Sequence, residues 1–122
     1  MISELKRLLS NSYSPYDSKC FSCIVEMKDG KTFNGVTVKN AIFRGGIYAE
    51  QIAIGSAVAK GYKYGDFERI YLMVGTKNIG DLKYLNSNVI SEFFEPEKAV
   101  VLYTIDEENR VIKVGNLYNN IY

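Results

Sequence analysis

Two uninterrupted apolar runs constrain the fold of this chain more than any other feature of its sequence. They are residues 70–74 (IYLMV) and 99–103 (AVVLY), and the segments around them are polar. A strand with one face in water alternates apolar and polar side chains, so an unbroken apolar run indicates a strand covered on both faces. We therefore predict that both runs form the centre of a β-sheet.

Residues 20–27 and 32–38 predict two more strands, because β-branched and aromatic side chains recur along both runs. Residues 28–31 (KDGK) join them, and an Asp-Gly pair between two such runs is a strong hairpin signal. A last hairpin through residues 106–109 adds a fifth strand.

Three helices follow from the spacing of apolar residues and from capping signals. Residues 5–9 carry three leucines on one helical face. Residues 48–60 are small or apolar almost all round and end at Gly61, which predicts a helix buried on most of its surface. A third helix begins at residues 86–87 and ends before Pro96.

The element order α-β-β-α-β-α-β-β predicts an α/β fold, a three-layer α/β/α sandwich with a mixed five-stranded sheet. A chain of 122 residues suits a single domain, residues 1–122. No apolar stretch approaches the roughly 20 residues of a membrane-spanning helix, and the first residues have no signal-peptide run. We therefore expect a cytoplasmic protein without a membrane partner.

The charge balance disfavours a polyanionic partner. Lys and Arg total 15, Asp and Glu total 14, and the basic residues are scattered along the chain. Nucleic-acid binding usually shows as a basic patch or stripe. We therefore expect no nucleic-acid partner.

Cys20 and Cys23 have the C-x-x-C spacing that elsewhere serves redox chemistry or zinc binding. Here the pair lies in a predicted strand, where residues three apart point to opposite faces. The sequence has no His and no second Cys pair to complete a four-ligand site. We expect two buried thiols that behave as small hydrophobic residues.

Short motifs along most of the chain resemble the small cytidine deaminases. They are Asp29-Gly30-Lys31, Asn34-Gly35-Val36, Ala49-Glu50 and Val89-Ile90-Ser91-Glu92. The Gly46-x-x-Ala49-Glu50 and Gly55-x-Ala57 spacings are more similar to the blasticidin-S deaminase branch. The resemblance implies the deaminase fold, which is the same α/β/α sandwich, and descent from a nucleoside hydrolase.

The resemblance also implies a catalytic zinc site, and there this sequence departs from the family. The family's ligands are a Cys or His two residues before the Glu and the two Cys of a Pro-Cys-x-x-Cys segment. The matching positions here are Tyr48, Lys83 and Asn86. Zinc binds thiolate, imidazole or carboxylate groups, and a protonated ammonium has no lone pair to donate. We therefore predict a degenerate member without zinc or another cofactor, in which Glu50 is a vestigial proton shuttle.

Loss of the metal would leave the Glu50 carboxylate in a low-dielectric site. We predict that the Lys83 ammonium enters the former zinc site and pairs with Glu50, while the Tyr48 ring fills volume or donates its hydroxyl. The alternative is a surface Lys83, with Glu50 protonated or bound to water.

The family's ligand-binding positions fall, by the same resemblance, on Thr37, Lys39, Tyr48 and Ala49. The ribose-binding Asn-x-Glu of the family matches residues 37–39, so a cation replaces the carboxylate that accepts the sugar hydroxyls. Lys39 is either a solvated lysine at a strand end, which is the commoner situation, or faces the pocket and favours an anionic ligand.

We predict a cytidine deaminase-like protein without deaminase activity that binds a nucleoside-like or other small ligand. The alternatives are an active nucleoside aminohydrolase, metal-free chemistry by Glu50, Lys83 and Tyr48, and a structural or regulatory subunit. Homo-oligomers are implied by the resemblance, so we expect a homodimer or homotetramer. The candidate contact residues are Ile42, Phe43, Phe94 and Tyr118.

Overall fold

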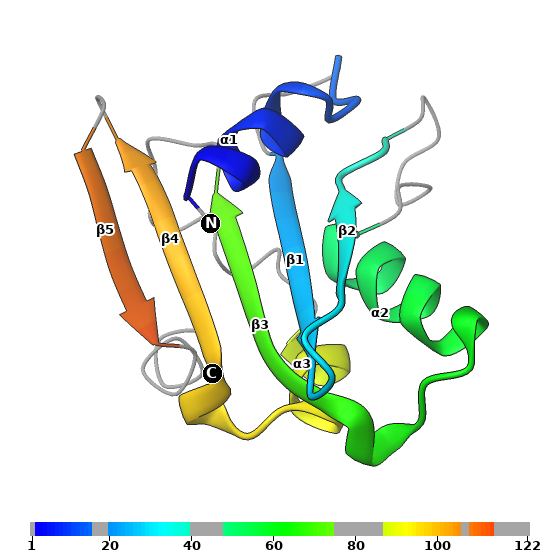
Figure 1. The fold of residues 1–122 in the computed structure, drawn as a ribbon. Coiled ribbons are helices and arrows are strands. Elements are labelled where there is room, and N and C mark those ends of the chain that lie inside the picture. Colours follow the sequence, from blue (N-terminus) through cyan, green and yellow to red (C-terminus); the bar gives the residue numbers. More distant parts are fainter. Residues whose placement is uncertain (1, 16–19, 40–47, 75–86, 106–107, 114–122) are drawn as a thin grey trace.

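The computed structural model describes residues 2–15, 20–39, 48–74, 87–105 and 108–113. Figure 1 shows a twisted sheet with helices on both faces. The elements are α1 (Ile2–Ser10), β1 (Phe21–Met27), β2 (Thr32–Val36), α2 (Ala49–Lys60), η1 (Tyr64–Asp66), β3 (Phe67–Val74), α3 (Ser87–Phe93), η3 (Pro96–Lys98), β4 (Ala99–Ile105) and β5 (Glu108–Lys113).

The sheet has five strands in the order β2-β1-β3-β4-β5. Strands β3 and β4 pair in parallel from Ile70 opposite Ala99 to Val74 opposite Tyr103, and the other neighbours pair antiparallel. The two apolar runs of the sequence are therefore adjacent strands inside the sheet. This arrangement confirms the prediction of a mixed five-stranded sheet.

The sheet separates two apolar clusters of unequal size. On one face Leu5 and Leu8 of α1 pack on Ile24 and Met73. The other face carries α2 and α3, and the larger cluster there includes Ala53. The three-layer α/β/α sandwich is therefore confirmed. None of the helices in the described ranges is long and apolar enough to cross a membrane.

Helix α2 ends as the sequence indicates, but its burial differs from the prediction. Gly61 has φ 109°, its N–H bonds the Val58 carbonyl, and the Tyr62 N–H bonds the Ala57 carbonyl. This pattern is a Schellman motif, which favours glycine in the left-handed region. The prediction of a helix buried on most of its surface was wrong. Only one stripe is buried: Ala49, Glu50, Ala53, Ile54 and Ala57. Small side chains on the other face are exposed to solvent.

Three local predictions also need correction. Strand β2 ends at Val36 rather than at residue 38, and Val38 instead forms an isolated parallel bridge with Tyr13. Cys23 is buried as expected, whereas Cys20 precedes β1 and is only half-buried. Phe94 is 6% exposed and belongs to the core, so in this chain it does not offer an exposed contact. The other suggested contact residues lie outside the described residues: Ile42, Phe43 and Tyr118.

Candidate functional site

Glu50 lies in the first turn of α2 and is completely buried. It is the only charged residue in the described part of the chain that is buried. Burying a carboxylate is costly, although the positive end of the helix dipole at the first turn favours negative charge there. A buried acid at a helix N-terminus therefore marks this position as the candidate site.

The start of α2 fixes the position of Glu50. Tyr48 is the N-cap residue, and its backbone N–H donates a 3.4 Å hydrogen bond to Oε1 of Gln51. This bond satisfies one of the amides that the first turn leaves without a helical partner. The Tyr48 side chain is 42% exposed, so part of its ring faces solvent.

Gly35 lets the first turn of α2 lie directly against strand β2. A Cβ atom at this glycine would lie 2.0 Å from the carbonyl oxygen of Ala49 and 2.9 Å from the amide nitrogen of Ala53. No side chain fits in that space, so backbone rests on backbone. The Ala49 methyl group is buried in the apolar cluster beneath the helix.

Cys23 on β1 lies close enough to Glu50 to feel its charge. It lies opposite Gly35 in the β1–β2 register and belongs to the cluster on the α2 face. Burial, and then the charge of Glu50, raise the pKa of its thiol well above the usual range. The thiol therefore stays protonated, and a thiol in that state is a poor nucleophile and a poor metal ligand.

Thr37, a predicted ligand-binding residue, is engaged by the strand next to it. Its Oγ1 accepts a 2.9 Å hydrogen bond from the Phe21 N–H and donates a 3.3 Å bond to the Phe21 carbonyl oxygen. The hydroxyl thus joins the end of β2 to the start of β1. Lys39 is half-buried, and its backbone N–H donates to the Tyr13 carbonyl oxygen at 2.8 Å.

The described residues around Glu50 do not fit a catalytic zinc ion. A zinc enzyme site usually has three thiolate, imidazole or carboxylate ligands. Over the described ranges, no three His, Cys, Asp or Glu side chains gather closely enough to hold a metal. Tyr48, which the resemblance puts at the first ligand position, carries a phenol, and burial keeps the Cys23 thiol protonated. Lys83 and Asn86 lie outside the described residues, so the pairing of Lys83 with Glu50 stays a prediction.

Sequence reasoning missed two residues that shape this site. Gly35 had a readable signal, because a glycine inside a strand often marks the close approach of another backbone. Cys23 had none, because nothing in its local pattern distinguishes a thiol beside a carboxylate from an ordinary core residue. The strand register and the helix position together reveal that relationship.

The match to known proteins covers most of the chain. A sequence model of the cytidine and deoxycytidylate deaminase zinc-binding region matches residues 5–81. Among curated proteins, the cytidine deaminase of Mycoplasma genitalium is 24% identical over 109 residues, which cover 89% of this chain and 81% of that protein.

Solved structures give the same assignment. The cytidine deaminase from Burkholderia pseudomallei is 27% identical, with a TM-score of 0.70 over 95% of this chain and 91% of that one. The enzyme from Mycobacterium leprae shares the fold at 22% identity, with a TM-score of 0.59 over 94% of this chain and 91% of its own. The chain therefore belongs to the cytidine and deoxycytidylate deaminase family.

Proposed function

We propose that this protein is a non-catalytic member of its family that binds a small nucleoside-like or other polar ligand at Glu50 without hydrolysing it. The observation that carries this proposal is the residue at the N-cap of α2. Tyr48 stands two residues before the buried Glu50, where the family has its first zinc ligand. We propose in the same way that Lys83 and Asn86 replace the family's other two zinc ligands.

Glu50 alone is too weak a catalyst for hydrolytic deamination. A positioned general base typically accelerates a reaction by about 10²–10⁴-fold. A zinc ion contributes several kcal/mol more, because it both lowers the pKa of water and stabilises developing charge. The Cys23 thiol does not replace that contribution, because burial keeps it protonated.

The site keeps the features needed for recognition. A buried carboxylate at the end of a helix accepts hydrogen bonds from N–H groups more strongly than one in water does. Glu50 is held by the backbone contact at Gly35, which does not depend on a metal. A ligand that presents N–H donors, such as an amidine-like edge of a base, matches this chemistry.

The test compares the natural chain with a variant that restores the family's ligands. We expect purified wild-type protein to hold no stoichiometric zinc by elemental analysis and to deaminate neither cytidine nor blasticidin S. The triple variant Tyr48→Cys, Lys83→Cys, Asn86→Cys should bind about one zinc per chain if these positions converge. One zinc per wild-type chain, or turnover that Glu50→Gln abolishes, would show that the chain is an active aminohydrolase instead.

Ligand binding is tested separately from catalysis. We expect cytidine or a purine or pyrimidine relative to raise the unfolding temperature of the wild-type protein, and Glu50→Gln to abolish that shift. Val58→Ala serves as the control, because Val58 is exposed on the same helix and makes no contact described at the site. A shift that survives Glu50→Gln would place the ligand elsewhere.

Self-association is a second candidate function, favoured by one surface observation. Tyr13 and Val38 form a bridge to each other, and their side chains are 54% and 39% exposed. Adjacent exposed apolar side chains often mark a contact surface. We expect a dimer or tetramer by light scattering at micromolar concentration, with dissociation in Tyr13→Ser. A monomeric wild-type protein would contradict this candidate.

A further inference from the structure

A concave surface lies beside the segment that follows α2 in the chain. Its volume is about 550 Å³, and it lies between the end of α3, η3, and the turn that leads from η1 into β3. None of the residues that line it belongs to α2 or is one of the residues described around Glu50. We call this surface the aromatic hollow and define it by Tyr64, Phe67, Phe93, Glu68, Glu92 and Glu95.

The walls of the hollow are a connected series of rings. The Phe67 ring lies 4.8 Å from that of Phe93 and 5.6 Å from that of Phe94 between centroids. The Tyr64 ring continues the series 6.1 Å from Phe93. Phe67 and Phe94 are buried and serve the core, whereas Tyr64 is 69% exposed at the edge. A large ring so exposed contributes little to core packing and is available to a ligand.

Carboxylates outnumber ammonium groups at the rim, which includes Glu68, Glu92 and Glu95 together with Lys28 and Lys98. Lys98 is neutralised by Glu68, whose Oε1 lies 3.0 Å from the lysine Nζ. Glu92 and Glu95 also line the hollow, and a hydrogen bond to Glu97 raises the pKa of Glu95 because two carboxyl groups are crowded together. A cation placed here would relieve that crowding.

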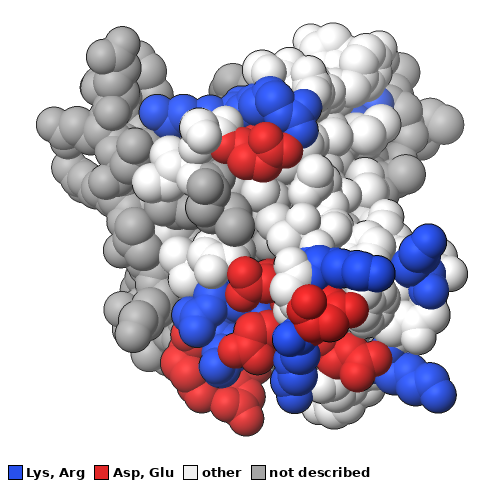
Figure 2. Space-filling view, in the orientation of Figure 1, with Lys and Arg blue, Asp and Glu red and all other residues white. Residues whose placement is uncertain are grey.

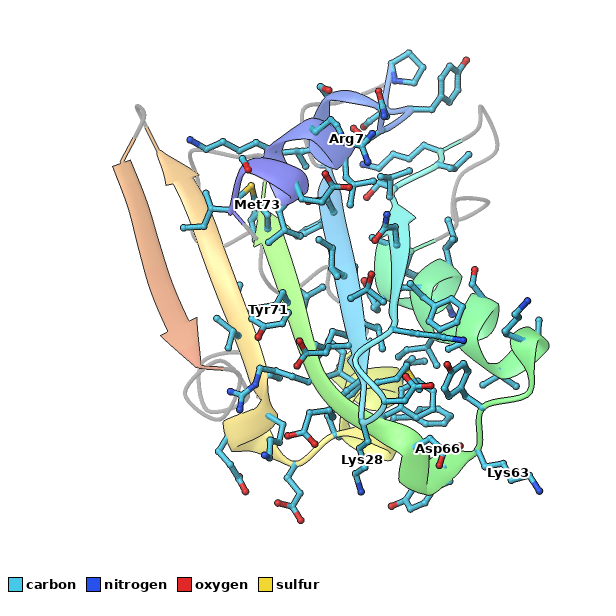
Figure 3. All side chains as sticks on the ribbon, viewed as in Figure 1. Arg7, Lys28, Lys63, Asp66, Tyr71 and Met73 are labelled. Atoms are coloured by element: carbon cyan, nitrogen blue, oxygen red, sulfur yellow. The ribbon has the colours of Figure 1, made fainter. Side chains whose placement is uncertain are left out.

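Lys28 is the other ammonium at this surface, and it offsets part of the negative charge of the rim. Its backbone N–H donates to the Asp66 carbonyl oxygen at 2.9 Å. Its side chain extends outward from the lower end of the molecule in Figure 3. Figure 2 shows acidic and basic side chains interleaved over the lower part of the face in view, so no large basic patch forms there.

We propose that the aromatic hollow binds a small organic cation that carries an aromatic or apolar body. The exposed Tyr64 ring and the half-buried Phe93 ring give the body a surface to stack on. An ammonium near aromatic faces and carboxylates gains both cation–π and ionic attraction. The volume lies in the range of small-molecule sites, about 300–1,000 Å³. The C-terminal end of α3 adds partial negative charge on the same side.

Three probes of nearly equal size separate charge from shape. They are phenethylammonium, 2-phenylethanol and phenylacetate, which are a cation, a neutral alcohol and an anion. In amide NMR titrations of the full chain we expect saturable shifts at Gly65, Glu92 and Phe93 with phenethylammonium. We expect weaker binding of the alcohol and none of the anion, and the affinity of the cation should fall as salt rises.

Two exposed residues allow substitution without loss of the fold. Tyr64→Ala and Glu92→Gln should each weaken phenethylammonium binding by about threefold to tenfold. Ile2→Ala is the control, because Ile2 is also an exposed apolar residue but lies on α1 and does not line the hollow. It should leave the affinity unchanged.

The proposal is independent of ligand binding at Glu50. It would be overturned if phenethylammonium gave no saturable shifts, if phenylacetate bound equally well, or if the Tyr64 and Glu92 variants bound as tightly as the wild type. Loss of cytidine binding would have no bearing on it.

Discussion

The two ends of helix α2 are built in contrasting ways. At the N-terminal end the helix rests on Gly35 with no room for a Cβ atom, and Glu50 and Cys23 are completely buried. At the C-terminal end the chain passes through Gly61 to the aromatic hollow, where Tyr64, Glu92 and Glu95 are exposed to solvent. We call the N-terminal end of α2 the closed end, because backbone packing defines it. We call the C-terminal end the open end, because side chains define it. The protein's own backbone therefore holds the start of α2 in place, while the open end can change with little cost to the fold.

The sharpest test of this contrast is a methyl group at Gly35. Gly35→Ala should lower the free energy of unfolding by about 3 kcal/mol or more, because the new Cβ would overlap the Ala49 carbonyl and push α2 away from the sheet. Urea unfolding followed by circular dichroism measures the loss. Gly55→Ala is the control: it has open space around it on an exposed helix face, so it should be neutral or stabilise by up to about 1 kcal/mol. Equal effects at the two glycines would show that the closed end is not tightly packed.

A smaller effect is expected at Thr37, which ties β2 to β1. Thr37→Val keeps the shape but removes both hydrogen bonds to Phe21, so the free energy of unfolding should fall by about 1–3 kcal/mol. Thr32→Val on the exposed part of β2 should change it by less than about 0.5 kcal/mol. If Thr37→Val were neutral and instead abolished ligand binding, the threonine would be a ligand contact, as the resemblance implies.

At the open end, Tyr62 supplies a contact whose contribution depends on pH. Its hydroxyl donates a 2.6 Å hydrogen bond to Oδ2 of Asp29, which lowers the pKa of Asp29 and raises that of Tyr62 to about 12. Because folding lowers the pKa of Asp29, the hydrogen bond stabilises the fold fully at pH values above the pKa that Asp29 has in the unfolded chain. That stabilisation is lost as pH falls through the lower pKa of Asp29 in the folded protein. Because folding raises the pKa of Tyr62 to about 12, the stabilisation is also lost as pH rises through about 12.

Tyr62→Phe should therefore destabilise the protein slightly at neutral pH, with a difference from wild type that shrinks in acid. Asp29 is exposed and Tyr62 only half-buried, so solvent weakens the interaction. Unfolding curves of the two proteins at several pH values measure it. A difference that grew as pH fell would contradict the assigned hydrogen bond.

The smallest effect should follow removal of the most exposed ring. Tyr64→Ala should change the free energy of unfolding by no more than about 0.5 kcal/mol, because the side chain is 69% exposed. A loss as large as that of Gly35→Ala would mean that the hollow is part of the core, and the contrast between the two ends would fail.

The sequence predicts the sheet better than it predicts the helices that cover it. The runs at residues 70–74 and 99–103 predict buried strands, because a short continuous apolar run in a domain of this size is typical of a strand covered on both faces. The Asp-Gly pair at residues 29–30 announces the hairpin, and Gly30 has φ 87° as such a turn requires. Local chemistry decides these features, so a local pattern reveals them.

Helix α2 shows why the packing of the helices could not be predicted from local sequence. Its many alanines and glycines are compatible with burial and equally with exposure, because small side chains cost little in either place. Contact with Gly35 on strand β2 determines which face of α2 packs against the sheet. The sequence of α2 alone does not show which face that is. Phe94 likewise looks like a residue for an external contact until Phe67, distant in sequence, is placed against it.

The parallel pairing of β3 with β4 also affects the order in which the protein is made. Strands β1, β2 and β3 can pair as soon as Val74 has left the ribosome, but the partner of Ile70 is Ala99. At about 5–20 residues per second, the inner edge of β3 would wait roughly one to six seconds for β4 to be synthesised. During that time an apolar strand exposes unpaired backbone groups to neighbouring chains. Slow translation between residues 75 and 98 would thus raise the yield of aggregates without altering the native structure.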